Sequence, residues 1–203
     1  MQQADLFGED PPPAAVQPLP PLVLQEHPVE GYRGRTLVNA QQASLTVAFA
    51  VDFETAGERL TKSAAGGKYA AVPYGMPQPQ AVHIICEQLR KQSSSAATVL
   101  NIAGNGLYTF KAKLGMSQDA VNAWVFEVIR HVHQAQPLAR IRSGGQTGAD
   151  TAGLVAALAL KIPALGLYPK GFLRRGPTGK DYTSTREGLQ DELLHMARQL
   201  PQA

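Results

Sequence analysis

A glycine-rich turn at residues 143–150 has the residue types and spacing best suited to binding an anion. Its sequence, SGGQTGAD, follows a short strand and precedes a helix that we expect to begin at about Ala149. Three glycines within five positions remove Cβ atoms, so backbone N–H groups can approach a phosphate closely. The N-terminus of the helix adds partial positive charge at the same place. The turn therefore predicts a phosphate cradle, although it matches neither the P-loop pattern nor G-x-G-x-x-G.

The side chains of this turn add groups that could reach phosphate or ribose oxygens. Two hydroxyls and an amide are available, and Asp150 lies in the first turn of the expected helix. Its carboxylate would either cap that helix or bind ribose hydroxyls. The alternative for the whole stretch is a tight strand-to-helix turn that binds nothing. The residues expected to bind a ligand here are Ser143, Gly144, Gly145, Gln146, Thr147, Gly148 and Asp150.

Two further strands end in turns of a similar kind. The apolar run at 45–51 is typical of a strand buried on both faces, and Thr55 and Gly57 follow it at the start of a helix. A strand at 97–103 runs into Gly104. We expect Thr55 and Gly57 to form the wall opposite the cradle, and Asn101 and Gly104 to form its floor. Asn105 could contact a ligand, although a hydrogen bond to its own backbone is the simpler expectation.

A cationic residue is expected at the same edge. The strand at 164–168 ends in Pro169, Lys170 and Gly171, which would place the Lys170 ammonium against a phosphate. The segment 172–185 is rich in glycine, arginine and lysine. We interpret it as a mobile basic loop at the site or, alternatively, as a loop that is simply solvated.

The remaining sequence supplies the elements that would hold these turns. We expect helices at about 37–42, 81–91, 117–134 and 186–200, a helix that starts at 58–61, and a strand at 68–73. Two histidines in the 117–134 helix, His131 and His133, face different ways, so we expect no metal site. The single Cys86, together with the absence of an export signal or a membrane-length apolar run, favours a cytoplasmic protein.

The first thirty residues differ in composition from the rest of the 203-residue chain. Residues 1–30 are rich in proline and poor in aromatics, so we expect a disordered tail before a domain at 31–203. The tail begins with QADLF, which resembles the pentapeptide by which bacterial replication proteins dock on the sliding clamp. Gln3, Leu6 and Phe7 would make that contact, with the alternative being an unstructured start. A net charge of +3 is too small to predict a nucleic-acid surface by itself.

The 143–150 segment, followed some twenty residues later by Pro169 to Gly171, resembles the signature of the YpsA-like proteins in the SLOG superfamily. The DNA-processing protein DprA and the cytokinin-activating LOG enzymes are relatives, and some members carry a molybdenum-carrier label. In ordinary members that signature opens the domain. Here the later parts come first, at residues 35–39, 45–51, 55–57 and 101–104, so the chain resembles the circularly permuted branch over about 31–185.

This resemblance implies an α/β, Rossmann-like, three-layer domain with a mostly parallel sheet and a nucleotide pocket at the carboxyl ends of its strands. It implies a protein that binds a nucleotide or an ADP-ribose-like phosphorylated ligand, as a sensor or a sequestering protein. A homodimer is expected by analogy with related domains, and no firm cofactor is implied.

Two other functions remain open. The first is an N-glycoside hydrolase acting on a nucleotide or NAD, with LOG-like phosphoribohydrolase chemistry. It needs a carboxylate, and Asp150, Glu54 and Glu58 are the candidates beside predicted turns, with Asp150 the preferred catalyst. The Thr-x-x-Glu of the LOG motif is missing after Gly148, so we favour binding over catalysis. The second is a replication or DNA-processing accessory protein that docks on the sliding clamp.

Overall fold

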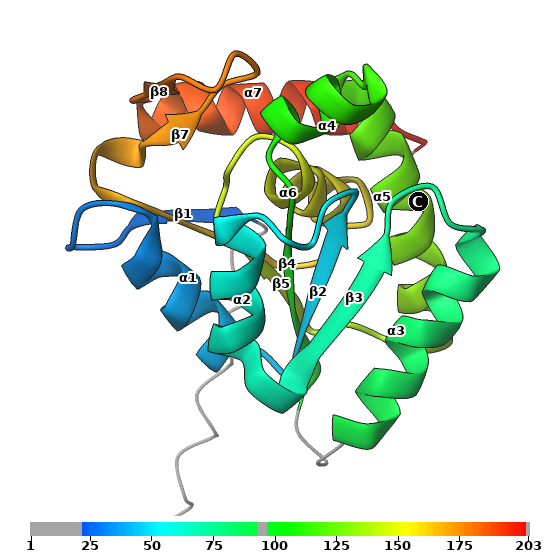
Figure 1. The fold of residues 1–203 in the computed structure, drawn as a ribbon. Helices are drawn as coiled ribbons and strands as arrows, with labels where there is room; N and C mark the ends of the chain where they lie inside the picture. Colours follow the sequence, from blue (N-terminus) through cyan, green and yellow to red (C-terminus); the bar gives the residue numbers. More distant parts are fainter. Residues whose placement is uncertain (1–21, 93–96, 202–203) are drawn as a thin grey trace, which may run out of the picture.

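A computed structural model describes residues 22–92 and 97–201 (Figure 1). Its six-stranded sheet has the order β1-β6-β5-β4-β2-β3, and every neighbouring pair is parallel. The strands of this sheet are β1 (Leu22–Glu26), β2 (Leu45–Ala50), β3 (Tyr69–Pro73), β4 (Val99–Gly104), β5 (Arg140–Ser143) and β6 (Ala164–Tyr168). The helices are α1 (Tyr32–Gln41), α2 (Ala56–Ala65), α3 (Gln78–Gln92), α4 (Leu107–Leu114), α5 (Gln118–Ala135), α6 (Ala149–Ala159) and α7 (Arg186–Arg198). Short 3-10 turns, η1 (Gly66–Lys68) and η2 (Lys170–Phe172), and an antiparallel hairpin of β7 (Arg174–Arg175) and β8 (Asp181–Tyr182) complete the described part.

Helices cover both faces of the sheet and give the structure three layers. α1 and α2 pack together on one face, α3, α5 and α6 pack on the other, and α7 packs against α6 (Figure 1). The composition of the strands requires this cover, since all six residues of β2 are apolar or threonine and all are buried. The α/β, Rossmann-like fold with a parallel sheet that the sequence predicts is thereby confirmed.

α6 is the helix that holds the glycine turn in place. Ten of its 11 residues are buried, and most of them are small. A Cβ atom added at Gly153 would lie 2.5 Å from the Cβ of Ile102 on β4, so the absence of a side chain lets α6 lie directly against the sheet. The turn at 143–150 is consequently fixed at the middle of the carboxyl edge, between β5 and α6.

Three expectations about the elements need correction. β1 lies inside the range 1–30 that was assigned to a disordered tail, because the apolar residues 22–24 follow the prolines and pair with β6 at the sheet edge. α1 begins at Tyr32, five residues before the expected start. The segment 172–185 is no simple loop, since it forms the β7–β8 hairpin and buries Arg174.

Three further expectations concern the start of the chain, membrane spans and metal sites. Gln3, Leu6 and Phe7 lie outside the described residues, so clamp docking stays a prediction. Within 22–92 and 97–201, none of the helices has the length and apolar character needed to cross a membrane. The same residues contain no group of three or more His, Cys, Asp or Glu side chains placed to hold a metal ion.

Candidate functional site

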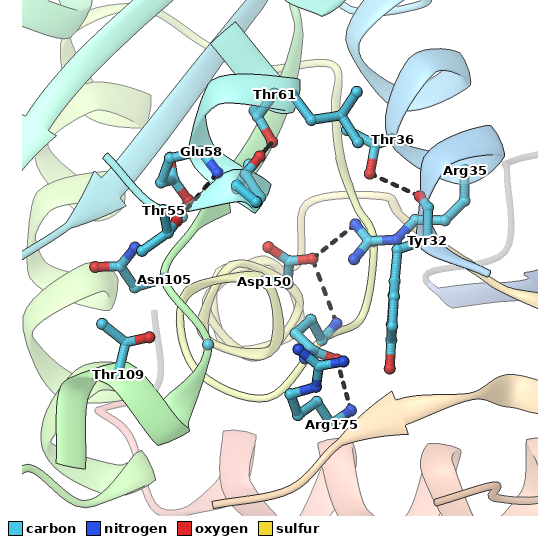
Figure 2. Close-up of a pocket in the computed structure, with 18 of the residues that line it drawn as sticks. Tyr32, Arg35, Thr36, Thr55, Glu58, Thr61, Asn105, Thr109, Asp150 and Arg175 are labelled. Carbon is cyan, nitrogen blue, oxygen red and sulfur yellow. Dashed lines mark hydrogen bonds and ion pairs between the residues drawn. The ribbon is translucent and has the colours of Figure 1, made fainter. Parts of the chain in front are cut away.

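A cavity of about 420 Å³ lies at the carboxyl ends of β4 and β5. One face of α1 and the N-terminal ends of α2 and α4 form its sides, and Arg175 of the β7–β8 hairpin lies over it (Figure 2). This is the edge at which open parallel sheets bind ligands. Seven of the residues that the sequence predicts for the site line this cavity: Thr55, Gly57, Asn101, Gly104, Gly144, Gln146 and Asp150.

Asp150 is the central group of the glycine turn. Its side chain is buried, and its Oδ2 accepts hydrogen bonds from Arg35 Nη1 at 3.0 Å and from the N–H of Gln146 at 3.3 Å (Figure 2). Burial raises the pKa of Asp150, and the Arg35 guanidinium and the Gln146 N–H oppose that rise. The turn therefore wraps around a carboxylate that belongs to the protein.

The glycines of the turn are required by close packing. Gly145 has φ 68°, and a Cβ atom there would lie 2.1 Å from the buried ring of Tyr168. Gly148 has φ 95°, and a Cβ atom there would lie 2.4 Å from the Asn105 carbonyl oxygen. Neither of these two glycines lines the cavity. Their conformation and crowding explain the glycine spacing without a ligand.

Four other residues predicted for the site make contacts outside the cavity. The Ser143 hydroxyl donates to the Asp150 carbonyl at 2.9 Å, and Thr147 Oγ1 donates to the Arg175 carbonyl at 2.6 Å. Lys170 is exposed, with its Nζ 3.6 Å from a Glu30 carboxylate oxygen, and the neighbouring Gly171 lies apart from the cavity as well. In addition, the N–H of Gly148 donates to the side chain of Gln118 at 2.7 Å, so it is not free for an anion.

The wall formed by α2 begins as the sequence predicts. Thr55 caps the helix, because its Oγ1 accepts a hydrogen bond from the N–H of Glu58 at 3.2 Å. At Gly57 an added Cβ would meet no atom within 4 Å, in contrast to the glycines of the 143–150 turn. The α2 wall is therefore open toward the cavity.

Glu58 is the second buried carboxyl group of the cavity. Its residue is 3% exposed, and its pKa is raised from the ordinary 4.5 to about 8. Burial is the largest cause, the charges of Asp150 and Asp52 act in the same direction, and a hydrogen bond with Tyr69 opposes them. At neutral pH Glu58 therefore carries a proton next to an Asp150 carboxylate that Arg35 neutralises.

Five buried polar atoms without a hydrogen-bond partner lie on residues that line this cavity. One is Tyr32 Oη. The other four are Arg35 Nε, Asn39 Nδ2, Glu58 Oε2 and Asn101 Oδ1, and we call the residues that carry these four the floor cluster. Asn39 is oriented by Arg142, whose Nε donates to its Oδ1 at 3.2 Å, and this leaves the Nδ2 donor free. Asn101 donates through Nδ2 to Thr46 Oγ1 at 3.2 Å, and this leaves its Oδ1 as a free acceptor. Unsatisfied buried groups are uncommon in proteins and call for an explanation.

Asn105 has a different task from the one expected. Its Oδ1 accepts hydrogen bonds from the N–H groups of Val51 and Asp52, both at 2.9 Å, and its Nδ2 donates to the Asp52 carbonyl at 2.9 Å. These bonds join the ends of β2 and β4. Asn105 therefore fixes the shape of the cavity edge.

The β7–β8 hairpin covers the cavity and is tied to the glycine turn. The backbone N–H of Arg175 donates to Gln146 Oε1 at 2.8 Å, and its guanidinium pairs with Asp181 at 2.8 Å while lying over the Tyr32 ring. Arg174 is almost fully buried and makes two bonds with Glu192 at 2.7 and 3.0 Å. It also donates to the Gly145 carbonyl at 3.2 Å, which anchors the hairpin.

Sequence reasoning missed one whole face of α1. Tyr32, Arg35, Thr36 and Asn39 all line the cavity and follow the spacing i, i+3, i+4 and i+7, which places them on one side of a helix. This pattern of polar residues could have been recognised in the sequence. It was missed because the helix was expected to start only at residue 37, in the middle of the pattern. Arg175 was also missed as a lining residue, and Glu58 was considered only as a candidate carboxylate.

Comparison with known proteins gives a match to one family. No curated protein matches the chain. The stretch that matches this family, residues 141–194, begins in β5 and ends within α7. It contains the glycine turn, α6, β6 and the hairpin. The resemblance that the sequence predicts is confirmed over residues 141–194, which match the circularly permutated YpsA SLOG family.

Proposed function

We propose that the protein binds a nucleotide or an ADP-ribose-like phosphorylated ligand in this cavity, as a sensor or a sequestering protein. The observation that carries the proposal is the floor cluster, four buried polar atoms without partners on the wall of a cavity of about 420 Å³. A ligand with several hydrogen-bonding groups would satisfy them, and the cavity has a volume in the usual range for small-molecule sites.

Charge and family support the same class of ligand. Two arginines, Arg35 and Arg175, line the cavity, and Arg175 extends from the hairpin toward its mouth. Two aromatic residues, Tyr32 and Tyr108, offer rings for a planar base. The family match over residues 141–194 supports a nucleotide-related ligand or a LOG-like function and specifies no ligand.

Thermal unfolding in the presence of AMP, ADP, ATP, NAD and ADP-ribose tests the proposal. A ligand that binds the folded state raises the melting temperature with the logarithm of its concentration. Arg175→Ala should reduce the rise, whereas Lys170→Ala, which removes the same charge outside the cavity, should leave it unchanged. No rise with any of the five ligands, or an equal loss in both variants, would contradict binding at this cavity.

A second function, N-glycoside hydrolysis, is favoured by the pair of carboxyl groups. Glu58, whose pKa is raised to about 8, would donate its proton to the leaving base. Asp150 would stabilise positive charge on the sugar carbon as the bond to the base breaks. A water molecule would then form the new C–O bond, and its proton would be released to solvent.

Product analysis separates this second function from simple binding. Incubation with AMP or NAD should release adenine or nicotinamide, and Glu58→Gln and Asp150→Asn should each abolish the release. Binding without release in the wild-type protein would contradict the hydrolase and retain the binding proposal.

A further inference from the structure

The glycine turn is already occupied by an anion of the protein. Asp150 Oδ2 accepts from the Gln146 N–H and from Arg35, which are groups that would otherwise contact a phosphate in the turn. The side chain of Arg35 also crosses the turn, since a Cβ at Gly144 would lie 1.5 Å from its Nη1. A ligand phosphate in this position would meet a carboxylate of like charge, so the phosphate must lie elsewhere.

The floor cluster has a mixed set of donors and acceptors. Arg35 Nε and Asn39 Nδ2 are donors, and Asn101 Oδ1 is an acceptor. The carboxyl group of Glu58, with a pKa of about 8, can donate as well as accept at neutral pH. A phosphate dianion only accepts, and would leave Asn101 unsatisfied. A hydroxyl group both donates and accepts, so two adjacent hydroxyls can satisfy both kinds of partner.

We propose that the floor cluster, together with Asp150, binds a pair of adjacent hydroxyl groups such as the cis-diol of a ribose, and that the ligand phosphate lies toward the cavity mouth. This rests on the proposed nucleotide binding. Figure 2 shows Asp150 with both dashed lines on one oxygen and its other oxygen directed toward the α2 side. That oxygen and Asn101 Oδ1 accept from the two hydroxyls, and Arg35 and Asn39 donate to them.

The mouth of the cavity has the groups that suit the other parts of a nucleotide. Tyr108 is half-exposed, and the side chain of Arg175 is 47% exposed, so both lie at the outer part of the site. The guanidinium of Arg175, which also pairs with Asp181, contacts a phosphate there, and the Tyr108 ring packs against a base. The ligand orientation is therefore the reverse of the one that the glycine turn predicts.

Calorimetric titration with AMP, ADP and ATP, each compared with its 2′,3′-dideoxy form, tests the orientation. Removal of both hydroxyls leaves buried donors and acceptors unpaired, so we expect each dideoxy nucleotide to bind at least about tenfold more weakly. Inorganic phosphate alone should compete only weakly, because its site at the mouth is exposed.

The variant Asn101→Leu removes the acceptor at nearly constant volume and should reduce the difference between AMP and its dideoxy form to less than about threefold. Asn122→Leu is the matched control, since Asn122 is equally buried on α5 but lies outside the cavity. It should preserve the full difference. The comparison of ligands on the wild-type protein remains decisive if a variant fails to fold.

The outcomes distinguish the two proposals. Nucleotides that bind equally with and without the hydroxyls would overturn the inferred orientation and leave nucleotide binding intact. An equal loss of discrimination in Asn101→Leu and Asn122→Leu would overturn the assignment to the floor cluster. If none of the nucleotides binds in either form, the proposed function fails, and the orientation fails with it.

Discussion

The glycine turn at 143–150 and the polar face of α1 form two sides of one cavity, and they differ in how their polar groups are used. In the turn, the N–H groups of Gln146 and Gly148 and the Thr147 hydroxyl all have protein partners. On the α1 side, Arg35 Nε and Asn39 Nδ2 are buried without partners. The turn has the more recognisable sequence, but the α1 face has more unpaired polar groups that could bind a ligand.

This difference separates two reasons for glycine in a strand-to-helix turn. Gly145 and Gly148 lie against a ring and a carbonyl, so they serve packing. Gly57, at the start of α2, has open space where a Cβ would be, so it leaves room beside the cavity. Glycine spacing alone does not tell these two cases apart, whereas the surroundings of each Cα do.

Gly145→Val should have the largest effect. A β-branched side chain at φ 68° is strained, and its Cβ would overlap the buried Tyr168 ring. We expect a loss of more than about 4 kcal/mol in the free energy of unfolding, measured by urea denaturation followed by circular dichroism. A stable Gly145→Val protein that merely fails to bind nucleotides would show that the glycine serves the ligand.

Arg35→Met should cost about 3 kcal/mol, because it leaves the buried Asp150 carboxylate without its partner. The double variant Arg35→Met/Asp150→Asn removes the charge as well and should recover part of the loss. A double-mutant cycle measured by urea denaturation gives the coupling. Additive losses would indicate that the ion pair does not hold the turn to α1.

Glu58→Gln should change how stability depends on pH. The folded protein retains the Glu58 proton up to about pH 8, whereas the unfolded chain releases it near 4.5. The folded state therefore binds more protons in this window, and the wild-type protein loses stability as the pH rises through it. Because Gln does not titrate, Glu58→Gln should gain about 4 kcal/mol over the wild type between pH 5 and pH 8.5.

Melting temperatures across this pH range provide the measurement. The control is Glu54→Gln, since Glu54 belongs to the same turn but is exposed. It should follow the wild-type curve. Parallel curves for wild type and Glu58→Gln would contradict a raised pKa at Glu58.

Much of the architecture could be predicted from the sequence, because strand and helix patterns are local. The buried strand β2, the Thr55 cap and the helix after the glycine turn all appear where expected. β1 was missed since its five residues follow prolines and become a strand only by pairing with β6. Its formation depends on a partner some 140 residues away in sequence, which no local pattern reveals.

The site could be predicted in location more than in detail. Turns that end parallel strands must share one edge, so Thr55, Asn101 and Asp150 meet in one cavity as expected. The sequence could not show which polar groups would form hydrogen bonds within the protein, such as the Asp150 carboxylate, which accepts from its own turn. Nor could it show that Arg174 of the hairpin would be buried rather than solvated.

Gly57→Ala should have the smallest effect on stability, and it tests whether the ligand contacts the α2 wall. Gly57 has ordinary backbone geometry in a helix and no atom within 4 Å of the added methyl group, so the free energy of unfolding should change by less than about 1 kcal/mol. The methyl group narrows the cavity beside Glu58, so AMP should bind several-fold more weakly if the ligand contacts the α2 wall. Calorimetric titration measures this, with Gly67→Ala as control, because Gly67 also has open space but lies outside the cavity. Equal AMP affinity in Gly57→Ala and wild type would place the ligand away from α2 and against the glycine turn after all.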